Sequence, residues 1–274
     1  MLLKLVPNDT AMAEGSHFIK DEVQYNHIHR ITEDPDSLCL KAEDGKMIFA
    51  QMPGRNGFIW MAKDVALPDR NEIFEKLAST LKELPGIVAD PQVAKEFSEC
   101  YSKTYAVQSE TVMTTEAYVC PKLIPPKNIN GELCKATEHH VDTVAHFLAG
   151  FVSDAFGTPV EPPTEAERAR KMIESGTVYL WNVNNQPVSI ANIAHRSPRH
   201  ARITAVYTPN AHRKNGYASM LVAELCAIIQ SENLIPMLFA DIKNPDSNKV
   251  YQNIGFIQRG RIEEIKFLKK EVLK

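Results

Sequence analysis

The sequence predicts an α/β fold in which helices flank a twisted mixed sheet. Apolar runs typical of strands alternate with helical periodicity along the chain of 274 residues. A strand at 201–208, a helix at 217–233 and a strand at 236–242 follow one another directly. This order predicts a crossover connection between two parallel strands.

A proline-rich stretch, CPKLIPPKNINGEL at 120–133, divides the chain into two halves. Its three prolines disfavour a helix and favour an extended connector. We therefore expect two domains, an N-terminal α/β domain at 1–125 and a second α/β domain at 132–274.

The elements of the first half follow from short apolar runs and one amphipathic helix, in which apolar residues recur at helical spacing. In chain order we expect strands at 46–52 and 57–62, a helix at 71–84, a strand at 86–89, a helix at 91–103 and a strand at 112–119.

The second half shows nearly the same order of elements. In chain order we expect a helix at about 138–151, a helix entered from the loop 158–171, strands at 177–183, 187–195 and 201–208, a helix at 217–233, a strand at 236–242, a short helix within 244–255 and a strand within 256–267.

Composition excludes several classes of protein. A net charge of −3 and a pI near 6.3 give no bulk attraction to nucleic acid or to anionic lipid, and neither partner is expected. The five cysteines contain no CxxC pair, which argues against a disulfide framework or a zinc site.

No apolar run has the ~18 to 20 residues of a membrane span, and the opening MLLKLVPNDT is too short for a signal peptide. We expect a soluble, cytoplasmic protein, and the sequence does not predict its oligomeric state.

A basic turn containing glycine, HRKNGYA at 212–218, leads into the helix at 217–233. The amino terminus of a helix offers unpaired N–H donors and the positive end of the helix dipole, so such a turn can hold phosphates with its backbone. Gly216 and Ala218 keep the backbone accessible, and Arg213 and Lys214 add positive charge. Asn215 and Ser219 can supply further polar contacts. A basic surface loop that caps an ordinary helix is the structural alternative.

A second segment, NPDSNKVYQNIGF at 244–256, favours the phosphate-binding interpretation of the turn over the surface loop. Arg213, Gly216 and Ala218 fit an RxxGxA pattern at a strand-to-helix junction, and this segment follows it in the right order and spacing. Together the two motifs resemble the GNAT superfamily of acyl-CoA-dependent N-acyltransferases over about the last half of the chain. The resemblance implies a GNAT-like sheet and acetyl-CoA as the acyl donor.

The resemblance also implies roles for individual residues. It implies that Tyr251 is the general acid that protonates the departing coenzyme sulfur, whereas the structural alternative is a tyrosine packed through its ring. Asn244 and Ser247 are expected to hold the pantetheine amides, with helix capping as the alternative. The expected contacts of the coenzyme are Val206, Tyr207, Thr208, Arg213, Lys214, Asn215, Gly216, Tyr217, Ala218, Ser219, Asn244 and Ser247.

The sequence does not identify the general base that would deprotonate the amine. No acidic residue lies on the strand at 201–208, and the candidates are Asp241, His195, His200 and Glu116. None of them is assigned. Three further histidines, at 139, 140 and 146, lie in the helix expected at about 138–151 without a carboxylate-rich ligand pattern. We expect them to be solvated, and we expect no metal.

The first half resembles a degenerate copy of the second. Aligning ADPQVAKEFSECY with KNPDSNKVYQNIG matches Pro91 with Pro245 and sets Phe97 in the place of Tyr251, and the segment 63–74 has no RxxGxA. Chance similarity between two α/β units is the alternative. In either case we expect the first half to shape the acceptor pocket and not to bind coenzyme A.

These observations predict an N-acetyltransferase that moves an acetyl group directly from acetyl-CoA to a primary amine of a small molecule or peptide. Transfer of another acyl group, transfer to a hydroxyl, and a non-catalytic acyl-CoA sensor or interaction module are the alternatives. Presence of Tyr251 favours the enzyme over the sensor. The sequence does not predict which acceptor is used.

Overall fold

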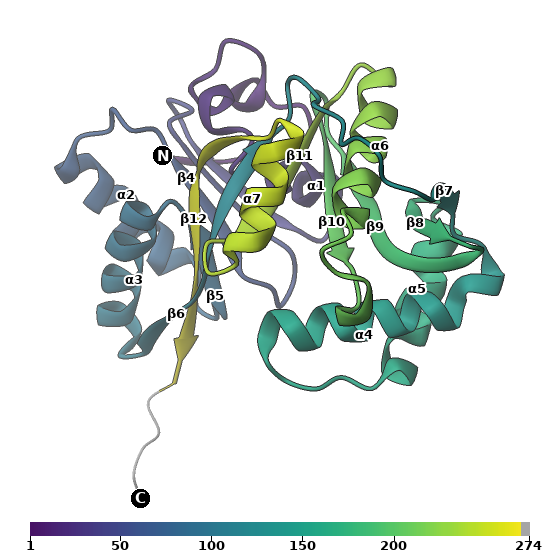
Figure 1. Cartoon of the computed structure of the whole chain (residues 1–274). Coiled ribbons are helices and arrows are strands. Elements are labelled where there is room, and N and C mark those ends of the chain that lie inside the picture. Colours follow the sequence, from purple (N-terminus) through teal and green to yellow (C-terminus); the bar gives the residue numbers. More distant parts are fainter. Residues whose placement is uncertain (270–274) are drawn as a thin grey trace, which may run out of the picture. The chain divides into compact units, whose positions relative to one another are not determined.

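The computed structural model describes residues 1–269, and the chain forms two compact units (Figure 1). The first unit comprises Met1–Ala117, Ala240–Asn244 and the described residues from Gln258 onward, and the second comprises Tyr118–Phe239 and Pro245–Ile257. These ranges differ from the expected 1–125 and 132–274, because the last strand pairs with a strand of the first unit and not with its sequence neighbours.

The first unit contains a mixed sheet with the strand order β1-β2-β3-β4-β5-β12-β6. Most neighbours are antiparallel, and β4 and β5 are parallel. The strands are β1 (Leu2–Lys4), β2 (Leu38–Ala42), β3 (Met47–Gln51), β4 (Gly57–Met61), β5 (Gly86–Ala89), β6 (Gln108–Val119) and β12 (Ile257–Leu268).

Two long helices cover this sheet, and three short helical segments precede them. Phe74 and Leu77 of one long helix and Phe97 of the other pack with Phe49 and Ile59 of the sheet in a single core. The helical segments are η1 (Thr10–Met12), η2 (His17–Asp21), α1 (His27–Glu33), α2 (Leu67–Thr80) and α3 (Pro91–Tyr105).

The second unit contains the strand order β11-β10-β9-β8-β7. The neighbours from β7 to β10 are antiparallel, whereas β10 and β11 are parallel, which confirms the predicted crossover through the helix between them. The strands are β7 (Glu132–Lys135), β8 (Val178–Val183), β9 (Gln186–Arg196), β10 (His200–Tyr207) and β11 (Ile235–Asp241).

Within the described residues, four α-helices and two 3-10 turns accompany these strands. Two of them pack side by side and share a core with Val178, Leu180 and Ile190, and a third buries Leu221 and Leu225. The helical segments are η3 (Glu138–His140), α4 (Val141–Phe156), α5 (Pro162–Glu174), η4 (Asn210–His212), α6 (Tyr217–Ser231) and α7 (Pro245–Ile254). The helix expected at about 138–151 is thus a short 3-10 turn followed by a longer α4.

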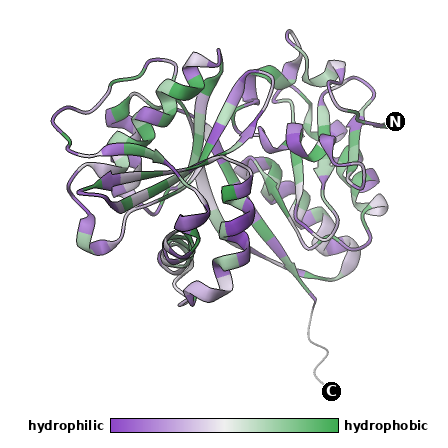
Figure 2. Cartoon of the chain, turned by 90° about the vertical axis from the view of Figure 1, so that its right-hand side faces the viewer, coloured by the Kyte–Doolittle hydropathy of each residue, from purple (hydrophilic) through white to green (hydrophobic). Residues whose placement is uncertain are grey.

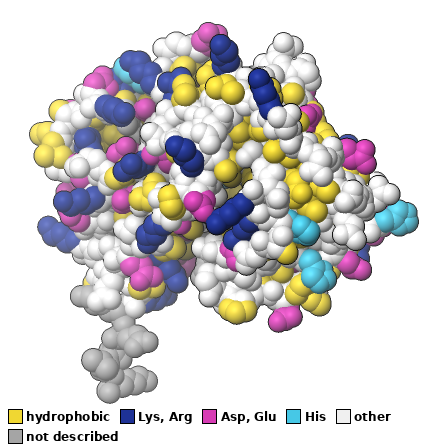
Figure 3. Space-filling model, viewed as in Figure 1, with side chains coloured by type: hydrophobic (Ala, Val, Ile, Leu, Met, Phe, Trp, Pro, Cys, Tyr) yellow, Lys and Arg dark blue, Asp and Glu magenta, His cyan; other side chains and the backbone are white. Residues whose placement is uncertain are grey.

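The distribution of apolar residues explains why these elements form. Figure 2 shows hydrophobic stretches along the strands and mixed colouring along the helices, as expected for sheets covered by amphipathic helices. On the face drawn in Figure 3, basic and acidic side chains are interspersed, in agreement with a net charge of −3. Within residues 1–269, no helix is long and apolar enough to cross a membrane.

Candidate functional site

The basic turn lies between β10 and α6 and has an unusual backbone. Lys214 and Gly216 have φ angles of +64° and +79°, in the left-handed region that glycine adopts without strain. A Cβ atom at Gly216 would also lie 2.6 Å from Cδ1 of Ile129, a residue of the connector. Glycine is therefore favoured at position 216, both by its backbone conformation and by the proximity of the Ile129 side chain.

The first turn of α6 presents backbone donors without a cap. Gly216 is the N-cap, and among the described residues no side chain caps this helix. The N–H of Met220 donates to the carbonyl of Gly216 at 3.0 Å, so the N–H groups of Tyr217, Ala218 and Ser219 precede the first intrahelical bond. Together with the helix dipole, these donors form a site that suits a diphosphate.

The strands beside the turn diverge toward it. β10 and β11 pair in parallel over His200–Arg202 and Ile235–Met237, the first residues of each strand. Closer to the turn, Ala205 has a φ of 51°, and the register against β9 shifts between Thr204 and Tyr207. One extra residue on β10 makes this a β-bulge, which leaves backbone groups outside the ladder. In open α/β sheets, ligands bind at such carboxyl ends of parallel strands.

The guanidinium of Arg213 is engaged by the protein itself. Its Nε donates to the carbonyl of Thr208 at 2.9 Å, its Nη2 donates to the carboxylate of Asp154 on α4, and its Cζ lies 5.8 Å from the ring centroid of Tyr207. The positive charge of Arg213, which the sequence suggested for binding phosphate, is therefore paired with a carboxylate. This partner lies 59 residues away in the sequence, and sequence reasoning missed it.

Side chains also donate hydrogen bonds to backbone carbonyls of the turn and of the end of β10. The side-chain amide of Asn215 donates to the carbonyls of His212 and Arg213, both at 3.1 Å. Ser189 Oγ donates to the carbonyl of Tyr207 at 3.0 Å and lies 2.9 Å from the hydroxyl of Thr208. The carbonyls of Tyr207 and Thr208 thus each accept one protein donor already, whereas Val206 belongs to the bulged end of β10.

Tyr251 lies on α7, and its side chain is buried. It is 7% exposed, and its ring contacts the rings of Tyr118 and Phe256 at centroid distances of 6.3 and 5.9 Å. Its hydroxyl has no hydrogen-bond partner within residues 1–269, and burial raises the pKa of this group above its ordinary value. The hydroxyl therefore stays protonated at neutral pH and keeps its donor free for a ligand atom.

Asn244 and Ser247 lie at the start of α7. The backbone N–H of Asn244 donates to the carbonyl of Asp241 at 3.1 Å, directly before the helix, and Ser247 lies in its first turn. Both positions are compatible with the capping alternative and with a polar contact to a ligand. Their assignment to the pantetheine amides stays a prediction.

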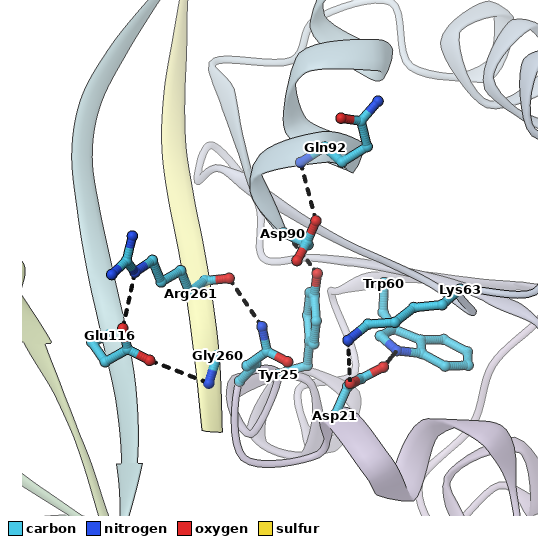
Figure 4. A network of polar contacts seen from close by, with 10 residues as sticks. Asp21, Tyr25, Trp60, Lys63, Asp90, Gln92, Glu116, Gly260 and Arg261 are labelled. Carbon is cyan, nitrogen blue, oxygen red and sulfur yellow. Dashed lines mark hydrogen bonds and ion pairs between the residues drawn. The ribbon is translucent and has the colours of Figure 1, made fainter. Parts of the chain in front are cut away.

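Glu116 is held by a polar network in the first unit (Figure 4). Its two carboxylate oxygens accept from the N–H of Gly260 at 3.3 Å and from Nε of Arg261 at 3.0 Å, and it is 5% exposed. In the same network the hydroxyl of Tyr25 accepts from the N–H of Asp90, whose own carboxylate caps α3. A carboxylate bound in this way has a structural role, and we do not assign it as a base.

The other candidate bases also have local structural surroundings. Asp241 Oδ1 accepts from the backbone N–H of Lys243 at 2.8 Å. His200 begins β10 and His195 pairs with Arg202 in the neighbouring register, at the end of the strand away from the turn. At about 3.3 Å per residue, the seven steps from His200 to Tyr207 span about 23 Å. The two histidines are therefore not near the turn.

Two of the histidines at 139, 140 and 146 have local contacts. His140 Nδ1 accepts from the N–H of Thr137 at 3.0 Å, and His146 Nδ1 lies 2.8 Å from the carbonyl of Asp142. In the part of the chain that the structure describes, no group of three or more His, Cys, Asp or Glu side chains could hold a metal ion.

The corresponding junction in the first unit lacks the features of the turn. β4, α2 and β5 form a parallel crossover like that of β10, α6 and β11. However, α2 begins at Leu67 after Ala66, and Pro68 in its first turn has no backbone N–H to donate. The first unit thus repeats the order of elements without a phosphate-binding turn. Its origin as a degenerate copy stays a prediction.

One family of known proteins matches the part of the chain that contains the turn. Residues 147–256 match the model of the acetyltransferase (GNAT) family, and this range includes Asp154, the basic turn and Tyr251. No curated protein matches the sequence.

Solved structures with the same fold cover nearly the whole chain. A GCN5-related N-acetyltransferase from Sphaerobacter thermophilus is 13% identical, with a TM-score of 0.61, over 99% of this chain and 96% of that chain. An acetyltransferase of the GNAT family from Colwellia psychrerythraea is 12% identical, with a TM-score of 0.56, over 98% of this chain and 100% of that chain. A GCN5-related N-acetyltransferase from Kribbella flavida is 14% identical, with a TM-score of 0.57, over 93% of this chain and 96% of that chain. These similarities confirm the predicted α/β fold with its twisted mixed sheet.

Proposed function

We propose that the protein transfers an acetyl group from acetyl-CoA to a primary amine, because residues 147–256 match the model of the acetyltransferase (GNAT) family. The single observation that carries the proposal is the uncapped amino terminus of α6, which follows a left-handed glycine at the carboxyl end of β10. A diphosphate supplies the acceptors that these backbone donors lack.

The residues around the turn fit the other parts of this donor. The bulged end of β10 at Ala205–Tyr207 offers backbone groups outside the ladder for a pantetheine arm, in the manner of an added strand. Asn244 and Ser247, at the start of α7, would hold the amides of the arm, and Lys214 adds an exposed positive charge to the turn. When bound, acetyl-CoA supplies an acetyl group activated as a thioester.

Tyr251 is the proposed general acid. Its hydroxyl is protonated at neutral pH because burial raises its pKa, and it has no protein partner within the described residues. It can therefore donate its proton to the sulfur that leaves. A backbone N–H at the bulge of β10 would polarise the carbonyl oxygen during attack by the amine.

The acceptor is proposed to be the primary amine of a small molecule or peptide, and the transfer to be direct and free of metal. The protein is proposed to act in the cytoplasm, where the five cysteines, all free thiols in the structure, would stay reduced. The general base is not assigned to any side chain.

A screen of acceptors tests the proposed function. The protein is incubated with acetyl-CoA and polyamines, amino acids, aminoglycosides or peptides with free amino termini, and the release of thiol is measured. We expect release above the background rate with at least one amine class and none with the Gly216→Glu variant, because a side chain at position 216 obstructs the turn. A parallel series with longer acyl-CoA donors identifies the preferred acyl group.

Two results would contradict the proposal. Absence of coenzyme A binding by calorimetry would exclude the donor. Tight binding of acetyl-CoA with no thiol release for any acceptor, and no effect of Tyr251→Phe, would instead indicate a non-catalytic acyl-CoA sensor.

A further inference from the structure

The guanidinium of Arg213 connects the basic turn to the residue that follows β10 and to α4. It donates to the carbonyl of Thr208 at the end of β10 and to the carboxylate of Asp154 on α4. The planar fork of an arginine fixes two such partners in one geometry, which a lysine cannot do. The conformation of the turn at 213–216 is thereby tied to α4.

A second contact joins the same two elements. Tyr207, the last residue of β10, lies under the guanidinium of Arg213, and its hydroxyl end packs closely against the backbone of Gly150 on α4. The ring of Phe147, one turn earlier on α4, contacts Tyr207 at a centroid distance of 6.2 Å. The strand end and the helix therefore meet along about two turns of α4, from Phe147 to Asp154.

Because of these contacts, we propose that Asp154 is a positioning residue for the coenzyme A turn, and that Arg213 acts as a clamp on the turn and not as a phosphate ligand. This inference rests on the proposed function, because it assumes that the turn binds coenzyme A. It assigns the recognition of the phosphates to the backbone donors of α6 and to Lys214.

The direction in which an Asp154 substitution changes the affinity for coenzyme A shows whether Asp154 positions the turn or only repels the ligand by its charge. Asp154 is a carboxylate close to a site for a polyanion, and by charge alone its removal should strengthen the binding of coenzyme A. If Asp154 instead holds Arg213 and thereby the turn, its removal should weaken binding. The ion pair is partly exposed, with 43% of the Arg213 side chain and 45% of the Asp154 side chain accessible, so the effect is expected to be moderate.

The experiment is calorimetric titration of the full-length protein with coenzyme A. We expect Asp154→Asn to raise Kd about threefold to fivefold. Arg213→Lys keeps the charge but loses the fork, and we expect a similar rise. The double variant should be no weaker than either single variant, because both remove the same clamp. Asp142→Asn, which removes an exposed carboxylate from the first turn of the same helix, is the matched control and should leave Kd unchanged.

Each other outcome has a definite meaning. Equal or tighter binding by Asp154→Asn, or full affinity in Arg213→Lys, would overturn the clamp while leaving the proposed function intact. Independent, additive losses in the double variant would also overturn it. Absence of coenzyme A binding by the unmodified protein would overturn the proposed function and this inference with it.

Discussion

Tyr251 combines a buried ring with a hydroxyl for which no hydrogen bond is found within residues 1–269. Its ring packs between Tyr118 and Phe256, which fixes the direction of the hydroxyl on α7. Tyr118 itself donates to Asn248 at 2.7 Å, and the two neighbouring tyrosines thus have different surroundings.

Removal of the Tyr251 hydroxyl should lower the rate but not the affinity. We expect Tyr251→Phe to reduce kcat by about 100-fold or more, the usual contribution of a positioned acid. The dissociation constant for coenzyme A should stay within about twofold, because the ring and its contacts are kept. Tyr118→Phe, which removes a neighbouring hydroxyl that already has a protein partner, is the control and should change kcat much less. Equal effects of the two substitutions would contradict the proposed acid.

The pH dependence follows from the direction of the pKa shift. A tyrosine ionises near pH 10 in water, and burial raises the pKa of Tyr251 above that value. The acid therefore stays protonated as the pH rises, and its contribution is lost only above about pH 10. We expect the ratio of kcat between the unmodified protein and Tyr251→Phe to be constant from about pH 7 to pH 9.5. A ratio that falls toward one within this range would indicate another acid.

At the scale of elements, the turn between β10 and α6 was predictable from sequence, whereas its supports were not. Glycine, basic residues and a following amphipathic helix are neighbours in the chain, so their pattern is local. Asp154 is one of many carboxylates on helix surfaces, and only the fold shows that it meets Arg213. Ile129 was assigned to the connector, and its contact with Gly216 depends on the path of that connector in space.

The contact between the connector and the turn gives a prediction about stability. Gly216→Ala places a side chain at a φ of +79° and against Ile129, whereas Gly157→Ala places one at a φ of +71° with no other atom within 4 Å. The backbone conformation alone costs about 1–2 kcal/mol at either site. We expect Gly216→Ala to lower the free energy of unfolding further than Gly157→Ala, as measured by urea denaturation.

In an Ile129→Ala background, the difference between the two glycine substitutions should disappear, because the obstructing side chain is gone. A difference that persists in this background would show that Ile129 is not what excludes a side chain at position 216.

At the scale of the whole molecule, the sequence predicted the elements of each half but not the membership of the last strand. The pattern at 256–267 indicates a strand, and nothing local specifies its partner. In the structure β12 pairs with β5, with Glu263 opposite Ala89 and Ile265 opposite Ile87, and Ile265 joins the core of the first unit. Strand pairing over this separation depends on tertiary packing, which a pattern of residues does not contain.

The place of β12 predicts how fragments behave. A fragment of residues 1–125 lacks the strand that lies between β5 and β6. We expect this fragment to unfold without a cooperative transition in thermal circular dichroism, and a fragment 1–125 joined by a flexible linker to residues 256–269 to regain one. Cooperative unfolding of 1–125 alone would contradict this expectation.

The same strand has a consequence for biosynthesis. When Ala117 has been added to the nascent chain, roughly 140 residues, through Gln258, are still to be translated. At about 5–20 residues per second, this delay lasts roughly 7 to 30 seconds. During that interval the nascent first unit has an unfilled position beside β5, with exposed strand edges that favour pairing with other chains. The nascent chain should therefore depend on chaperones until the residues of β12 emerge.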